Sequence, residues 1–114
     1  MMDCIFCKIV AGDIPSNKVY EDDKILAFRD LNPEAPEHVL IIPKKHITSL
    51  NHVTPEDHAL LGHIQVKVRE IAEFLGVSEK GYRLVANTGD EGGQTVHHLH
   101  YHLLGGRSMK WPPG

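Results

Sequence analysis

Three histidines alternate with apolar residues in the segment 98–103 (HLHYHL), near the C-terminal end of the chain. Successive side chains of a β-strand point to opposite faces, so a strand here places the three imidazoles on one face and Leu99, Tyr101 and Leu103 on the other. Imidazole is the usual side chain for proton transfer and metal binding near neutral pH. The pattern therefore predicts a strand with a core on one side and a chemically active face on the other.

The rest of the chain divides into short strands and two helices of unequal length. Residues 4–11 are predicted to form a short helix with Asp3 as its N-cap. A long helix is predicted to begin at Thr54 and to end at Gly76, because apolar residues recur between them at helical spacing. Strands are predicted at 18–21, 24–31, 38–42, 82–87 and 95–104.

Connections of hairpin length favour an antiparallel sheet. The expected fold class is therefore α+β, with about five antiparallel strands, one long helix and one short helix. The 114 residues fit one domain, 1–114, with a single core.

The overall charge excludes some classes of partner. The net charge is −3 with neutral histidines, so there is no basic surplus to bind nucleic acid. No apolar run approaches the roughly 18 residues that span a bilayer, so no membrane partner is expected. The first residues lack the basic and apolar regions of a secretory signal, and a cytoplasmic location is the default expectation.

Cys4 and Cys7 lie three positions apart. In a reducing compartment this spacing suits half of a metal site, a redox pair, or two plain thiols packed against a short helix. A thioredoxin-like pair requires a βαβ unit with a preceding strand, which the sequence does not predict. Two thiolates fill half of a tetrahedral zinc site, and His46 and His98 are candidates for the other half.

Strand geometry limits what three histidines on one face can do together. Neighbours on one face are about 6–7 Å apart, so His98 and His102 are separated by roughly 13 Å. Zinc–nitrogen bonds are about 2.0–2.1 Å long, so one metal could bind all three only with strain. A different role for each imidazole along one groove is expected, and the alternative is a polar face with surface histidines.

The loop 87–95 contains three glycines and leads directly into the histidine segment. Glycine permits close backbone approach to a ligand, and successive N–H groups can form a nest for an anion. The loop matches neither of the common phosphate-binding motifs, and a plain hairpin loop explains it equally well in isolation. Asp30, at a strand end, could bind ribose hydroxyls or form a turn.

The form His-φ-His-φ-His-φ-φ at 98–104, where φ is an apolar residue, resembles the signature of the histidine triad (HIT) family. The chain is similar to the Hint branch of that family, the purine nucleoside phosphoramidases, over nearly its whole length. The similarity is carried by the segments 4–9 (CIFCKI), 27–30 (AFRD), 33–36 (PEAP), 42–46 (IPKKH), 92–94 (GGQ) and 109–114 (MKWPPG).

The resemblance implies hydrolysis of the P–N bond in adenosine or guanosine phosphoramidates, with no cofactor required for the chemical step. It implies that His100 attacks the α-phosphorus and forms a covalent nucleotidyl-histidine, which water then cleaves. His102 and Thr95 would hold the phosphate oxygens, and Thr95 would also relay a proton to the leaving amine. His38 and His98 would support the nucleophile.

The resemblance also implies a purine nucleotide site in a homodimer that joins two sheets into one. Asn87 and the backbone of Gly93 would complete the phosphate cradle, and Asp30 would bind the ribose. Trp111 would reach toward the active site of the partner subunit. The purine pocket is implied for Phe6, Ile9, Phe28, Leu31 and Leu40.

The cysteine pair resembles the bacterial HIT proteins that bind structural zinc, so a zinc ion on Cys4, Cys7, His46 and His98 is expected. If His98 binds zinc, it cannot also donate freely in the active site. Thr95 stands where eukaryotic Hint proteins have serine, which keeps the hydroxyl and adds a methyl group.

Two other functions compete with this interpretation. One is a zinc-stabilised nucleotide-binding or protein-interaction module with little turnover. The other is a dinucleoside polyphosphate hydrolase, which the Trp-Pro-Pro-Gly ending disfavours.

Overall fold

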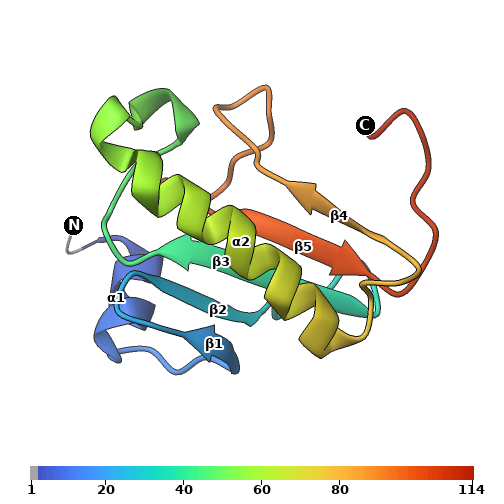
Figure 1. Ribbon diagram of the computed structural model, residues 1–114. Coiled ribbons are helices and arrows are strands. Elements are labelled where there is room, and N and C mark those ends of the chain that lie inside the picture. The colour runs from blue at the N-terminus through green and yellow to red at the C-terminus, as the bar shows by residue number, and fades with distance from the viewer. Residues whose placement is uncertain (1–2) are drawn as a thin grey trace.

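The computed structural model describes residues 3–114 and contains one antiparallel sheet of five strands. The spatial order is β1-β2-β3-β5-β4, so β5 lies between β3 and β4 (Figure 1). The predicted α+β architecture is confirmed. The strands are β1 (Lys18–Glu21), β2 (Ile25–Arg29), β3 (Glu37–Pro43), β4 (Tyr82–Val85) and β5 (Tyr101–Gly105).

The chain reaches this order by a crossover. After β3 it passes through the short 3-10 turns Leu50–His52 and Pro55–Asp57 into the long helix α2 (His58–Leu75). It then adds β4 at the far edge of the sheet and returns as β5 into the gap beside β3. The histidine segment thus leads into a central strand that is paired on both sides.

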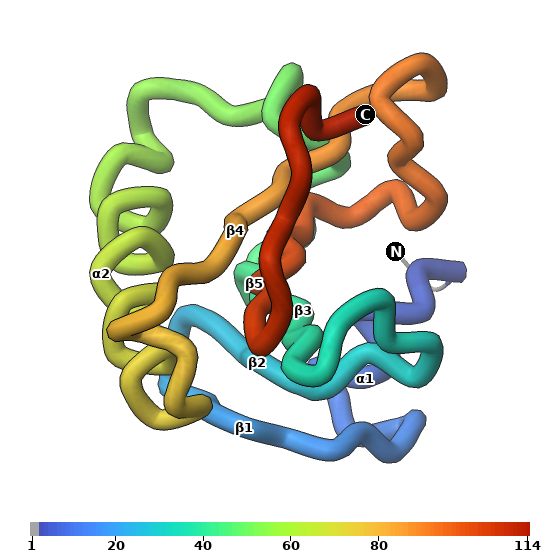
Figure 2. Tube along the Cα trace, turned by 90° about the vertical axis from the view of Figure 1, so that its right-hand side faces the viewer, coloured from blue at the N-terminus to red at the C-terminus, as the bar shows by residue number. Residues whose placement is uncertain are grey.

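The two helices cover opposite faces of the sheet. Figure 2 shows α2 on one side of the strands and the short helix α1 (Ile5–Ala11) on the other. Two separate apolar cores result. The core under α2 includes Ile41, Ile64 and Leu103, whereas the core under α1 includes Phe6 and Leu40.

The register of β5 against β3 decides which face each histidine takes. Tyr101 is paired with Ile41, and His102 is paired with Leu40. Residues paired across a sheet share a face, so Tyr101 belongs to the α2 face and His102 to the α1 face. The predicted alternation of imidazole and apolar side chains is therefore confirmed at β5.

The strand at the histidines is shorter than predicted. The sequence predicts a strand from Thr95, but β5 begins at Tyr101. Opposite the segment before Tyr101, β3 continues only through Ile42 and Pro43, and Pro43 has no N–H to donate. The Pro43 carbonyl is bonded to the His98 ring, and the Leu99 N–H donates to the Ile47 carbonyl, at 2.6 Å. The ladder therefore stops at Tyr101, while Leu99 still enters the α2 core.

The helix ends follow the sequence signals with two exceptions. Gly12 and Gly76 end their helices with left-handed φ angles of 85° and 77°, as predicted. The prediction that Asp3 caps α1 was wrong, because the N-cap is Cys4, whose sulfur accepts from the Cys7 N–H at 3.3 Å.

At the other helix, Thr54 is the N-cap of the first turn as predicted and forms a capping box with Asp57, but that turn is 3-10 and α2 begins only at His58. Among residues 3–114, the structure contains no helix that is both long enough and apolar enough to cross a membrane.

Candidate active site

A cavity of about 320 Å³ opens on the α1 face of the sheet, within the size range of small-molecule sites. One wall is apolar and comes from α1, β2, β3 and the segment after α1. The opposite end carries the imidazoles of His100 and His102. The lining consists of Ile5, Phe6, Ile9, Ile14, Pro15, Ser16, Asn17, Phe28, Arg29, Asp30, Leu31, Asn32, Leu40, Thr95, Val96, His100 and His102.

Phe6 of α1 joins the apolar wall to the imidazoles. Its ring lies edge-on to that of Phe28, with centroids 5.7 Å apart, and edge-on to that of His100, with centroids 5.1 Å apart. These contacts are of the favourable T-shaped kind. They fix the His100 ring at the border between the apolar and polar parts of the cavity.

A backbone hydrogen bond sets the tautomer of His100. Its Nδ1 lies 2.7 Å from the carbonyl oxygen of His98, and a carbonyl only accepts. The hydrogen of the neutral ring is therefore on Nδ1, and Nε2 keeps its lone pair. His100 is only 5% exposed and lines the cavity, so this nitrogen could act as a nucleophile toward a bound molecule.

A second chain of hydrogen bonds sets the tautomer of His102. The Glu34 N–H donates to Nδ1 of His38 at 3.0 Å, which leaves the hydrogen of His38 on Nε2. That N–H donates to Nδ1 of His102 at 2.9 Å, and one carboxylate oxygen of Asp30 lies 3.4 Å from the same His38 nitrogen. The hydrogen of neutral His102 is therefore on Nε2, where it is free to donate.

Burial, reinforced by the neighbouring His100 and His38, lowers the pKa of His102 to about 4. At neutral pH His102 is thus an uncharged hydrogen-bond donor. The cavity thus combines an unprotonated ring nitrogen and an N–H donor on adjacent rings, whose centroids are 5.0 Å apart. This arrangement suits attack on a phosphoryl group whose oxygens need hydrogen bonds.

Four side chains behind this cavity could hold a metal ion. The ligand atoms of Cys4, Cys7, His46 and His98 all lie within 4.8 Å of one another. Nδ1 of His98 lies 3.3 Å from the Cys4 sulfur, 3.6 Å from the Cys7 sulfur and 3.2 Å from Nδ1 of His46. A tetrahedral zinc site requires such N–S and N–N separations to be roughly 3.3–3.6 Å.

The tautomer of His98 fits a metal ligand. Its Nε2–H donates to the Pro43 carbonyl at 2.8 Å, so the lone pair of Nδ1 points at the two sulfurs. A ligand histidine usually has its second nitrogen anchored in this way. Burial lowers the pKa of both His98 and His46 and so favours the neutral form that binds metals. Burial raises the pKa of the Cys7 thiol, and the neighbouring Cys4 raises it further.

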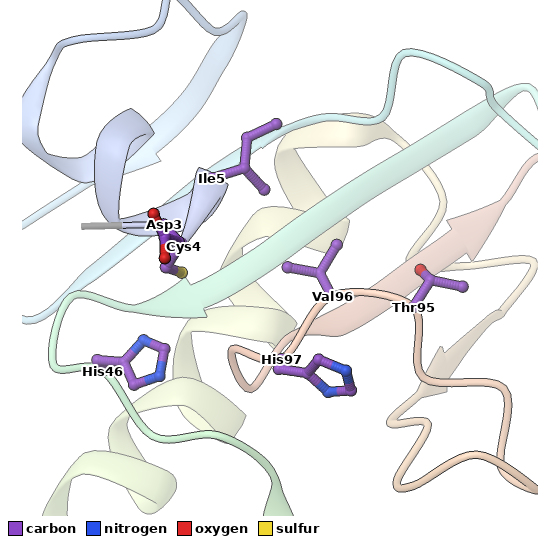
Figure 3. A pocket seen from close by; sticks show the side chains of 7 residues that line it. All are labelled: Asp3, Cys4, Ile5, His46, Thr95, Val96 and His97. Atoms are coloured by element: carbon purple, nitrogen blue, oxygen red, sulfur yellow. The ribbon is translucent and has the colours of Figure 1, made fainter. Parts of the chain in front are cut away.

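A second cavity, of about 430 Å³, adjoins the cysteine and histidine cluster. Figure 3 shows Cys4 at the start of α1, His46 on the loop after β3, and Thr95 to His97 on the chain before β5. Thr95 and Val96 line both cavities, so this short segment lies between them. His97 is exposed and belongs to the lining of this second cavity.

The comparisons with known proteins agree with this geometry. The HIT domain family matches residues 11–109 of the chain. The chain belongs to the HIT family. An uncharacterised HIT-like protein of Synechocystis is 58% identical over 112 residues, which cover 98% of this chain and 97% of the relative.

Solved structures show the same HIT fold. A HIT family hydrolase from Legionella pneumophila is 55% identical with a TM-score of 0.97, and the match covers 98% of this chain and 100% of that one. A histidine triad nucleotide-binding protein from Candida albicans is 38% identical with a TM-score of 0.83, over 96% of this chain and 83% of that one.

The cavity brings together most of the residues that the HIT resemblance implied. Of the residues implied to bind the nucleotide, three do not line it. Trp111 is 81% exposed and lies beside Arg83, 6.0 Å from ring centroid to guanidinium carbon. The Gly93 N–H already donates to the Asp90 carbonyl, and Asn87 is not part of the lining. The predicted residues that do line the cavity are Phe6, Ile9, Phe28, Asp30, Leu31, Leu40, Thr95, His100 and His102.

The two histidines expected to support His100 make different contacts in the structure. His38 contacts His102 through its side chain, and the structure gives it no hydrogen bond to His100. His98 supports His100 only through its backbone carbonyl, because its ring belongs to the cysteine cluster. The two roles foreseen for His98 are thus divided between its main chain and its side chain.

Several residues of the HIT site were not foreseen. Buried Gln94 accepts from the Gly89 N–H at 3.0 Å and donates to the Thr48 carbonyl at 2.7 Å, which holds the glycine loop against the body of the domain. Ser16 and Asn17 enter the cavity from the connector before β1. No periodicity marks such connector residues, and only the folded chain brings them to the site.

The low pKa of His102 predicts a pH-dependent stability. An unfolded histidine binds a proton near its ordinary pKa of 6.5, whereas folded His102 stays neutral down to about pH 4. The unfolded state therefore binds more protons in this window, and stability is lost as the pH falls from 6.5 toward 4.

In the His102→Gln variant, the free energy of unfolding should fall less steeply between pH 6 and pH 5, by up to about 1.4 kcal/mol per pH unit. Urea unfolding followed by circular dichroism measures both slopes. Equal slopes in the two proteins would contradict the assigned pKa.

Proposed function

We propose that this protein hydrolyses the P–N bond of purine nucleoside phosphoramidates through a covalent nucleotidyl-histidine, as a member of the Hint branch of the HIT family. The observation that carries the proposal is the 2.7 Å hydrogen bond from Nδ1 of His100 to the His98 carbonyl. It leaves the lone pair of Nε2 available at the cavity. The Legionella relative is described as a hydrolase and the Candida relative as nucleotide-binding, which supports the proposal.

The lining of the cavity suits a purine nucleotide. Aromatic and aliphatic side chains of the apolar wall, such as Phe28 and Leu40, would pack against the faces of the base. Asp30 directly follows β2, lines the same cavity and would accept hydrogen bonds from the ribose hydroxyls. The phosphate would then lie next to His100 and His102.

In the first step, Nε2 of His100 attacks the α-phosphorus and the P–N bond to the leaving amine breaks. The Nε2–H of His102 would donate to a phosphoryl oxygen and stabilise the charge that develops there. The amine must gain a proton as it departs. The hydroxyl of Thr95, which lines the same cavity, would relay that proton from solvent.

In the second step, a water molecule attacks the same phosphorus. The bond between phosphorus and Nε2 breaks, the water gives up a proton, and a nucleoside monophosphate leaves. His100 returns to its neutral form with the hydrogen still on Nδ1, because the His98 carbonyl remains its partner. These steps need only side chains of the protein, so the metal cluster is given no part in them.

His100→Ala should abolish turnover because it removes the nucleophile, with a loss on the order of 10³-fold or more. Mixing the protein with adenosine 5′-phosphoramidate, quenching and weighing the intact chain should reveal a nucleotidyl adduct on the wild type only. His58→Ala is the matched control, since His58 is exposed at the start of α2. Unchanged hydrolysis by the His100 variant would reject the assigned nucleophile.

We further propose that Cys4, Cys7, His46 and His98 bind a structural zinc ion. Two thiolates and two imidazoles form one of the usual donor sets of structural zinc, and the spacing of the ligand atoms fits a tetrahedron. Zinc would favour the thiolate form of Cys7 against the burial that raises the pKa of its thiol. The ion would tie α1 to the loop after β3 and to the chain before β5.

Protein purified without chelators should contain about one zinc ion per chain by elemental analysis. His46→Ala should lose most of that zinc, while the His58→Ala control should retain it. Removing the metal with EDTA should lower the melting temperature of the wild type, because binding energy at such a site stabilises the fold. Full zinc content in His46→Ala, or none in the wild type, would contradict the assignment.

We also propose that two chains pair along β4 to form a homodimer with one continuous sheet. β4 is an edge strand and presents unpaired backbone groups. Large apolar side chains remain exposed in the single chain, including Phe74 at 73% and Trp111 at 81%. In the dimer, Trp111 would approach the partner's cavity, and Asn87 and Gly93 would complete the phosphate cradle.

Light scattering at micromolar concentration should therefore give the mass of two 12.8 kDa chains. Dissociation should occur only on further dilution. A single-chain mass throughout the micromolar range would contradict the dimer.

A further inference from the structure

Among residues 3–114, the hydroxyl group of Ser16 lies in an unusual environment. Its hydroxyl oxygen is the one buried side-chain polar atom of residues 3–114 that lacks a hydrogen-bond partner. The same residue lines the cavity that contains His100 and His102. Buried hydroxyls are normally paired, and an orphan of this kind calls for an explanation such as a missing ligand.

The register of β1 and β2 places Ser16 along the cavity. Lys18 is paired with Phe28, and the Arg29 N–H donates to the Asn17 carbonyl at 2.9 Å. The antiparallel course therefore extends before the start of β1, with Asn17 beside Arg29 and Ser16 next to it, on the side of Asp30. Ser16 thus lies toward the end of the apolar wall where Asp30 would hold the ribose.

The oxygen is shielded from the open cavity as it stands, and rotation about the Cα–Cβ bond of Ser16 would turn it inward. We propose that in the nucleotide complex the rotated Ser16 hydroxyl hydrogen-bonds the sugar-side edge of the purine base and so acts as a specificity-determining residue. This inference rests on the proposed nucleotide site. The edge of a purine nearest the sugar carries N3, an acceptor, and in guanine also the 2-amino group, a donor. A serine hydroxyl can donate to the first and accept from the second.

This contact would distinguish one purine base from another, which the apolar side chains of the pocket cannot do. Side chains such as Phe28 and Leu40 pack on any flat ring and do not distinguish one purine from another. A buried polar group discriminates more sharply, because a base without the matching group leaves the hydroxyl unpaired. Ser16 would therefore favour guanine over hypoxanthine, which lacks the 2-amino group.

The experiment compares Ser16→Ala with the wild type on the 5′-phosphoramidates of guanosine, inosine and 3-deazaguanosine. Inosine lacks the 2-amino group, and 3-deazaguanosine lacks N3. Ser78→Ala is the matched control, since Ser78 is exposed beyond α2 and outside the cavity. We expect Ser16→Ala to lower kcat/KM for guanosine by about threefold to tenfold, the range of one net hydrogen bond.

The loss of kcat/KM caused by Ser16→Ala should be smaller for at least one of the inosine and 3-deazaguanosine substrates, because that base lacks the group that Ser16 would contact. An equal loss on all three substrates, or no loss on any, would overturn the inference. Stability gives a separate readout. Removing an unpaired hydroxyl should leave the urea midpoint unchanged or raised, whereas a lowered midpoint would indicate a structural hydrogen bond and count against the proposal.

Calorimetric binding of GMP and IMP by both proteins separates this inference from the proposed reaction. Ser16-dependent preference for GMP without any hydrolysis would reject the reaction and keep the base contact. Hydrolysis with no Ser16-dependent preference in binding or turnover would keep the reaction and reject the base contact.

Discussion

The antiparallel register between β3 and β5 determines which side chains reach the cavity. Because His102 is opposite Leu40, it lies on the α1 face, and its neighbours Tyr101 and Leu103 enter the core under α2. A shift of one residue would exchange the two faces and bury the imidazole in an aliphatic core. The apolar packing of both faces therefore enforces the position of the histidines.

Once the register is set, fixed hydrogen bonds decide what each imidazole can do. The carbonyl of His98 holds the hydrogen of His100 on Nδ1, while His38 holds that of His102 on Nε2. His100 thus has a nitrogen lone pair available at the cavity, and His102 has an N–H donor available there. His98 also contributes its ring to the cysteine cluster, so the residue that orients the proposed nucleophile is itself held by the candidate metal site.

The sequence predicted the number and kind of elements well, because they depend on local patterns. The strand 18–21 and the end of the long helix at Gly76 match the structure. Predictions failed where a distant neighbour decides the outcome. β5 starts at Tyr101 because Pro43 of the neighbouring strand has no N–H and its carbonyl is bonded to the His98 ring. α1 is capped by Cys4, whose sulfur lies within the cluster formed with the distant His46 and His98.

The sequence by itself determined the alternation that separates imidazoles from core residues, since the two-residue period of a strand is a property of the local backbone. The tertiary structure alone decided that His38 pairs with His102 across 64 positions and that Ser16 enters the cavity. Such contacts depend on the crossover through α2 and on strand register. These join segments far apart in the chain, and no local spacing records them.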